Sequence, residues 1–139
     1  MANVQTLGVV GAGQMGSGIA QVAAQSGLTV VVTDVNDAAL DKGRAAIASS
    51  LARLVKKETL TQAQSDDALQ RITWSTDLKA HAKADFVVEA VSENEPLKRK
   101  IFGELDAIVG ANAILASNTS SISITRLAAS TKRPEKFVG

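Results

Sequence analysis

Three glycines near the N-terminus have the spacing of a phosphate-binding turn. Gly11, Gly13 and Gly16 form a G-x-G-x-x-G pattern after a short apolar run and before a helical one. The first glycine allows a tight turn, the second lets the backbone approach a pyrophosphate, and the third lets a helix lie close to a sheet. The helix N-terminus then offers unpaired N–H groups to the phosphates. The residues that we expect to contact a dinucleotide here are Gly11, Ala12, Gly13, Gln14, Met15 and Gly16.

An acidic residue after the second apolar run indicates which dinucleotide is bound. Asp34 lies 23 positions after Gly11, where a carboxylate can accept hydrogen bonds from the adenosine ribose and would repel a 2′-phosphate. Val35 and Asn36 follow it, so no arginine is present there to receive that phosphate. We therefore expect NAD rather than NADP as the cofactor. The alternatives are that Asp34 serves only as a helix cap and that the glycines make only a tight turn.

These residues need a sheet and helices to position them. Short apolar runs predict strands at 6–10, 29–33, 72–74, 86–89 and 113–116, with a sixth strand beginning at 137–139. Helical periodicity or capping residues predict helices at 17–24, from 36 or 37 to about 57, from 61, from 96, and at 123–129. Strands that alternate with helices form βαβ units. The expected fold is therefore α/β, a Rossmann-type doubly wound parallel sheet with a helical hairpin inserted after the second strand.

Composition narrows the possible functions. The 139 residues are enough for one domain, and 45% hydrophobic with 21% charged residues is typical of a globular protein. A net charge of +1 and 3% aromatic residues do not suggest a nucleic-acid partner. The chain has no cysteine, which excludes a disulfide framework, a zinc ribbon and a thiol nucleophile. Without a basic leader or a long apolar run, we expect a cytoplasmic protein with no metal and no membrane partner.

Three stretches of the sequence resemble one family. They are Gly-Ala-Gly-Gln-Met-Gly-Ser-Gly-Ile-Ala at 11–20, Val-Val-Glu-Ala-Val-Ser-Glu at 87–93, and Ala-Ser-Asn-Thr-Ser-Ser-Ile-Ser-Ile at 116–124. The whole chain is similar to the L-3-hydroxyacyl-CoA dehydrogenases of fatty-acid β-oxidation and butyrate metabolism. The resemblance implies an enzyme that oxidises L-3-hydroxyacyl-CoA to 3-oxoacyl-CoA by hydride transfer to NAD, or the reverse. It also implies that 1–139 is the NAD-binding domain, cut short at its C-terminal end and lacking the helical domain that forms a homodimer.

The same resemblance assigns roles to individual residues. Ser120 would hydrogen-bond the substrate's 3-oxygen, and Asn118 would orient the nicotinamide or the substrate; the alternative for both is an ordinary turn residue. Further cofactor contacts would come from Glu89, Ala90, Val91, Glu93, Lys98, Asn118 and Ser120. The positions that would touch coenzyme A are Ser50, Lys57 and Ser120. Alternatively, residues 98–100 form a solvated helix face, and Lys57 only complements a helix C-terminus.

The catalytic base of that family is a histidine whose segment would begin beyond Gly139. The only histidine of this chain, His81, lies in a polar stretch, and we expect it at the surface. The chain is therefore expected to bind NAD(H) with negligible turnover. Two other functions remain open. One is a dehydrogenase of a sugar acid, of the gulonate type, and the other is a non-catalytic NAD-binding module.

Overall fold

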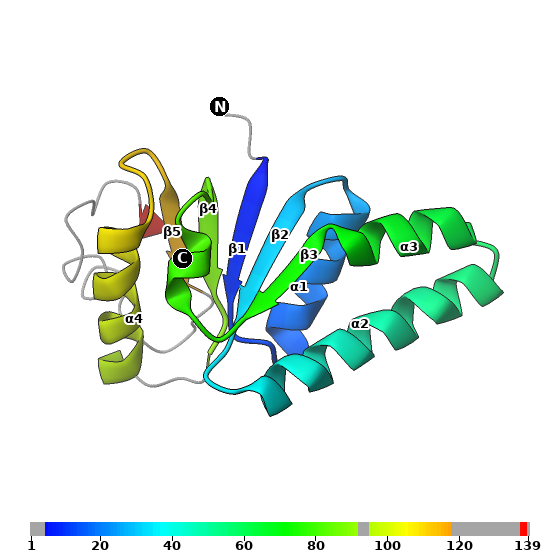
Figure 1. The fold of residues 1–139 in the computed structure, drawn as a ribbon, viewed down its shortest axis with the longest axis horizontal. Coiled ribbons are helices and arrows are strands. Elements are labelled where there is room, and N and C mark those ends of the chain that lie inside the picture. The colour runs from blue at the N-terminus through cyan, green and yellow to red at the C-terminus, as the bar shows by residue number, and fades with distance from the viewer. Residues whose placement is uncertain (1–4, 92–94, 118–136, 139) are drawn as a thin grey trace.

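The computed structural model describes residues 5–91, 95–117 and 137–138. Six strands form one sheet in the order β3-β2-β1-β4-β5-β6, and every neighbouring pair is parallel (Figure 1). The strands are β1 (Thr6–Val10), β2 (Thr29–Thr33), β3 (Ile72–Ser75), β4 (Phe86–Glu89), β5 (Ile114–Ser117) and β6 (Phe137–Val138). The predicted doubly wound parallel sheet is confirmed, including the start of a sixth strand.

Helices cover the two faces of the sheet with separate apolar cores. The helices are α1 (Gln14–Gln25), α2 (Asp37–Lys56), α3 (Gln62–Gln70), the short 3₁₀ helix η1 (Leu78–His81) and α4 (Glu95–Ile108). Strand β1 shows the division, because Val9 packs in the core under α1, α2 and α3, and Val10 packs in the core under α4. Both strand faces are thus buried, as apolar runs without alternation predict. Within the described part of the chain, no helix is long and apolar enough to cross a membrane.

The predicted helical hairpin is confirmed, and both of its helices begin at the expected caps. The Asn36 side chain accepts a hydrogen bond from the Ala39 N–H at 2.8 Å at the start of α2. The Thr61 hydroxyl accepts one from the Gln64 N–H, and the Gln64 side chain accepts one from the Thr61 N–H. This reciprocal pair is a capping box. Figure 1 shows α2 and α3 side by side, extending beyond the β3 edge of the sheet.

The buried face of α2 packs in the core and fixes the hairpin against the rest of the domain. Leu40, Ile47 and Leu51, which are spaced seven and four residues apart, share one face of the helix and are buried there. Arg44 lies between them on the same face but is exposed, and its guanidinium lies 5.5 Å from the centre of the Trp74 ring. An arginine fits this position because its flat cation is attracted to an aromatic face.

The start of α1 differs from the prediction by three residues, the other predicted helix boundaries agree within one residue, and one predicted helix lies outside the described residues. Helix α1 begins at Gln14, three residues before the predicted start, because Gly13 has an extended backbone and acts as the N-cap. The apolar periodicity on which the prediction rested begins only after the first turn of the helix. Helix α2 ends at Lys56, so that Lys57 is its C-cap. The helix predicted at 123–129 lies outside the described residues.

The prediction that His81 is a surface residue is wrong. Its imidazole is fully buried, and Nε2 shares a hydrogen bond of 2.8 Å with the Thr33 hydroxyl. Gly8 in β1 makes the room, because a Cβ there would overlap the His81 ring. Among the described residues, Nδ1 has no hydrogen-bond partner. Burial lowers the pKa of His81 from 6.5 to about 4.

This lowered pKa makes stability depend on pH. The folded chain holds His81 neutral and the unfolded chain protonates it near 6.5, so its contribution is present above pH 6.5 and is lost as the pH falls toward 4. Between pH 7 and pH 5, we expect the free energy of unfolding to fall by about 2 kcal/mol more in the wild type than in His81→Gln. A glutamine amide can still bond the Thr33 hydroxyl. Urea unfolding at both pH values measures this, and equal losses in the two proteins would contradict it.

Candidate functional site

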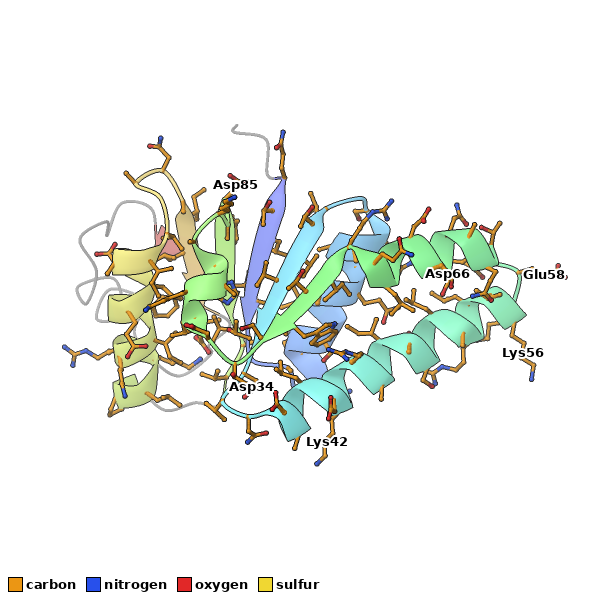
Figure 2. The ribbon with its side chains drawn as sticks, viewed as in Figure 1. Asp34, Lys42, Lys56, Glu58, Asp66 and Asp85 are labelled. Carbon is orange, nitrogen blue, oxygen red and sulfur yellow. The ribbon has the colours of Figure 1, made fainter. Side chains whose placement is uncertain are left out.

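The site lies at the carboxyl ends of the central strands. The chain order reverses between β1 and β4, which are neighbours in the sheet, and ligands of open parallel sheets bind at such a point. Figure 2 shows Asp34 at this end of the sheet and Asp85 at the opposite end. Asp85 has a structural role there, since its carboxylate accepts hydrogen bonds from the backbone N–H groups of Gln5 and Thr6 at 3.0 Å. These bonds hold the pKa of Asp85 below its ordinary value.

The glycine turn has the geometry that its spacing predicts. Gly11 has a φ of +108°, which side chains rarely tolerate. A Cβ on Gly16 would overlap the Gly11 carbonyl oxygen, so α1 approaches the turn as closely as a backbone can. A Cβ on Gly13 would meet nothing within 4 Å. The turn is therefore tightly packed at Gly11 and Gly16 and open at Gly13, where a pyrophosphate fits at the helix N-terminus.

Asp34 is held beside this turn by backbone groups. Its Oδ2 accepts a hydrogen bond from the Ala12 N–H at 2.7 Å, and its Oδ1 accepts one from the Val35 N–H at 2.6 Å. The carboxylate is half-buried, and each oxygen has a further lone pair. It can therefore accept hydrogen bonds from the two hydroxyls of a ribose without changing its orientation.

A cleft of about 720 Å³ opens next to Asp34. Its walls come from the strand ends, from η1 and from α4, and they include Gly11, Asp34, Val35, Leu78, Val91 and Ile101. Most of this lining is apolar. A flat heteroaromatic base attached to a ribose at Asp34 would find an apolar wall here.

Three polar side chains form a buried network beside the cleft. Glu89 accepts a hydrogen bond from Ser117 on one carboxylate oxygen, and the other oxygen forms an ion pair with Lys98. The second oxygen also accepts from the Val91 N–H at 2.6 Å. Glu89 and Lys98 are fully buried. The network joins the ends of β4 and β5 to the first turns of α4.

Lys98 therefore does not belong to a solvated helix face, which was one of its two interpretations. Arg99 and Lys100 are exposed, as that interpretation expects, and Lys98 points inward. Three adjacent basic residues look alike in the sequence. Only the buried carboxylate of Glu89, which attracts one of them, separates Lys98 from the other two.

Two residues that support the turn were missed by sequence reasoning. The buried Ser17 hydroxyl donates a hydrogen bond to the Ala12 carbonyl at 2.9 Å. A Cβ on Gly43 of α2 would lie 2.8 Å from both that carbonyl oxygen and the Ser17 hydroxyl oxygen, so α2 packs directly on the turn. The sequence does contain a signal for Gly43, because an isolated glycine inside a long helix usually has a packing reason.

The remaining predicted residues divide into two groups. Ser50 and Lys57 lie on the hairpin, with Ser50 half-buried and Lys57 exposed. Figure 2 shows Lys56, which precedes Lys57, at the end of α2 that is remote from Asp34, so the structure does not bring Lys57 to Asp34. Glu93, Asn118 and Ser120 lie outside the described residues.

The open space at Gly13 gives a test of the turn. We expect Gly13→Ala to fold with a loss of no more than about 1 kcal/mol, because alanine is a poorer helix N-cap than glycine. It should bind NADH at least about tenfold more weakly, because the new methyl group occupies the space of the pyrophosphate. NADH fluorescence gives the affinity, and urea unfolding gives the stability.

Gly18→Ala is the matched control, because its Cβ also meets nothing within 4 Å but lies one turn further along α1. It should bind NADH as the wild type does and gain up to about 1 kcal/mol of helix stability. If both alanine variants lose NADH binding equally, then the space above Gly13 is not the phosphate site.

Comparison with known proteins agrees with this geometry. The family model described as "3-hydroxyacyl-CoA dehydrogenase, NAD binding domain" matches residues 6–139. A 3-hydroxybutyryl-CoA dehydrogenase of Bradyrhizobium diazoefficiens is 51% identical over 136 residues, which are 98% of this chain and 46% of that protein. The alpha subunit of a fatty acid oxidation complex from Psychrobacter sp. is 41% identical over 137 residues, which are 99% of this chain and 19% of the subunit.

Solved structures give the same result. The crystal structure of (S)-3-hydroxybutyryl-CoA dehydrogenase from Ralstonia eutropha has a TM-score of 0.93 and 55% sequence identity, and the match covers 97% of this chain and 48% of that one. The chain spans about half the length of these 3-hydroxybutyryl-CoA dehydrogenases. It belongs to the 3-hydroxyacyl-CoA dehydrogenase family and forms the NAD-binding domain of that family.

Proposed function

We propose that this chain is the cofactor half of an enzyme that interconverts L-3-hydroxyacyl-CoA and 3-oxoacyl-CoA. The observation that supports this most directly is the fixed Asp34 carboxylate beside a turn with open space above Gly13. In a member of this family, that arrangement suits the adenosine ribose and the pyrophosphate of NAD. The named activity of the relatives supplies the substrate class.

The cofactor would lie across the strand ends in two halves. The adenosine half would bind on the β2 side at Asp34, and the pyrophosphate would bind the turn from Gly11 to Gly16. The nicotinamide half would then lie on the β4 and β5 side. Glu93, Lys98 and Asn118 are proposed to line that half, and Ala90, Val91 and Ser120 are the further cofactor contacts that we propose. Glu89, whose side chain is fully buried, would act through its neighbours.

The substrate contacts that we propose come from the sequence after β5 and from the hairpin. NAD, when bound, supplies the acceptor for the hydride. The Ser120 hydroxyl would donate a hydrogen bond to the substrate's 3-oxygen, on which charge changes during the reaction. Asn118 would orient the reacting groups. Ser50 and Lys57 on the hairpin would contact coenzyme A, with the lysine as a point charge for phosphate.

The position of His81 in the fold makes it unsuited to act as the catalytic base. Its ring is buried against Gly8 and bonded to Thr33, so it cannot reach a substrate hydroxyl. General acid–base catalysis typically contributes about 10²–10⁴-fold to a rate. We therefore propose that a histidine beyond residue 139 acts as the base, and that the longer protein forms a homodimer through the half that this chain does not cover.

The isolated chain should bind NADH without consuming it. NADH is titrated by fluorescence, acetoacetyl-CoA is then added, and NADH consumption is followed over time. We expect saturable binding and negligible consumption, and we expect brisk consumption by a protein extended to the length of its relatives. Rapid consumption by the 139-residue chain would overturn the role given to the absent histidine. A longer protein that binds NADH but ignores acyl-CoA substrates would overturn the substrate assignment.

Ser120→Ala tests the catalytic role in that longer protein. Loss of one hydrogen-bond donor to a developing oxyanion typically costs about 10²–10³-fold in kcat. We expect a loss of this size for acetoacetyl-CoA reduction, with little change in NADH affinity. The adjacent Ser121→Ala is the matched control and should retain activity. If the two variants lose activity equally, the effect does not come from a bond made by Ser120.

A further inference from the structure

The buried pair of Glu89 and Lys98 is more costly than its structural role requires. Two charges that leave water lose several kcal/mol of hydration each, and well-packed apolar residues commonly replace such pairs without loss of stability. Here both side chains are fully buried, at the end of a strand rather than in the middle of the core. Stability alone is therefore a weak explanation for the pair.

The pair lies on the side of the site opposite to Asp34. Asp34 follows β2, whereas Glu89 ends β4 and Ser117 ends β5, on the other side of β1 in the sheet. A dinucleotide that crosses the reversal point places one mononucleotide over each side. Because Asp34, which would bind the ribose, lies on the β2 side, the nicotinamide half would lie over the side that holds Glu89 and Lys98. This step rests on the function proposed above.

Glu89 also fixes the segment that follows β4, Ala90 and Val91, against the glycine turn. The carboxylate oxygen that faces Lys98 accepts the Val91 N–H, and the Lys98 ammonium lies 3.5 Å from the Val91 carbonyl. A Cβ on Gly11 would lie 2.9 Å from the Ala90 carbonyl oxygen and 3.3 Å from Val91 Cγ1. The end of β4, the segment of Ala90 and Val91, and the glycine turn are thus in direct contact, and the Glu89 carboxylate fixes them.

We propose that Glu89 is a positioning residue rather than a cofactor ligand, and that its pairing with Lys98 keeps the charge beneath the nicotinamide ring neutral, so that the pair favours neither NAD⁺ nor NADH. Both Glu89 oxygens are occupied by protein donors beneath the surface. The oxidised nicotinamide ring carries a positive charge and the reduced ring carries none. A net charge beneath the ring therefore changes the affinity for one redox form and not for the other.

The size of this effect follows from Coulomb's law. Two unit charges about 10 Å apart, at an effective dielectric constant of about 20, interact strongly enough to change a binding constant by roughly tenfold. Removal of the Glu89 charge leaves a buried ammonium that repels NAD⁺. Removal of the Lys98 charge leaves a buried carboxylate that attracts it. The two changes should therefore act in opposite directions on the ratio of the two affinities.

Four proteins test the proposal: the wild type, Glu89→Gln, Lys98→Met and the double variant. NADH affinity is measured by fluorescence and NAD⁺ affinity by competition with NADH. We expect the affinity for NAD⁺ relative to NADH to fall roughly tenfold in Glu89→Gln and to rise roughly tenfold in Lys98→Met. The double variant, in which both charges are absent, should return to the wild-type ratio. Arg99→Met, an exposed cation on the same helix, is the matched control and should not change the ratio.

The ratio separates this role from a purely structural one. A network that only supports the fold would lower both affinities by the same factor, and an unchanged ratio in both single variants would overturn the proposal. If Glu89→Gln does not fold, the rise in Lys98→Met and its reversal in the double variant still decide the question. A wild-type chain that binds neither dinucleotide would overturn the proposed function as well, whereas wild-type binding with an unchanged ratio overturns only this inference.

Discussion

The close approach of α1 to the turn after β1 is the constraint on which the site depends. Gly16 leaves no space for a Cβ against the Gly11 carbonyl oxygen, and a Cβ on Gly43 of α2 would lie 2.8 Å from the Ala12 carbonyl oxygen. The Ser17 hydroxyl donates a hydrogen bond to the Ala12 carbonyl. Because packing holds the turn from both helices, the N–H groups at the helix N-terminus are aimed before a ligand arrives. A pre-organised anion site loses less conformational entropy on binding.

Two carboxylates at the same edge of the sheet have different roles because their environments differ. Asp34 is half-buried and, among the described residues, is held by backbone N–H groups, so its outer lone pairs remain available for hydroxyl donors. Glu89 is fully buried, and its oxygens accept from Lys98, Ser117 and the Val91 backbone. A buried carboxylate must be paired in this way, since an unpaired charge in the interior is very costly. The first can therefore bind a ligand directly, whereas the second can act only through its neighbours.

Predictions from the sequence succeeded where the physical signal is local. Strands β1, β2 and β4 have the predicted bounds, because a buried parallel strand is a short apolar run between turn residues. The caps at Asn36 and Thr61 were predictable for the same reason, since each bonds a backbone group only three residues away. The start of α1 was misplaced because its first residues belong to the glycine turn, and because the helix is capped by Gly13 backbone geometry rather than by a side chain.

The sequence by itself determined the α/β class, the order of the elements, the glycine turn and the position of Asp34 beside it. Each of these depends on residues that are adjacent or a fixed number of positions apart. Only the tertiary structure decided that His81 is buried beneath Gly8 and bonded to Thr33, and that Lys98 rather than Arg99 or Lys100 pairs with Glu89. The physical reason is that burial and ionic partners are set by contacts between distant segments, and a polar residue carries no local mark of such a partner.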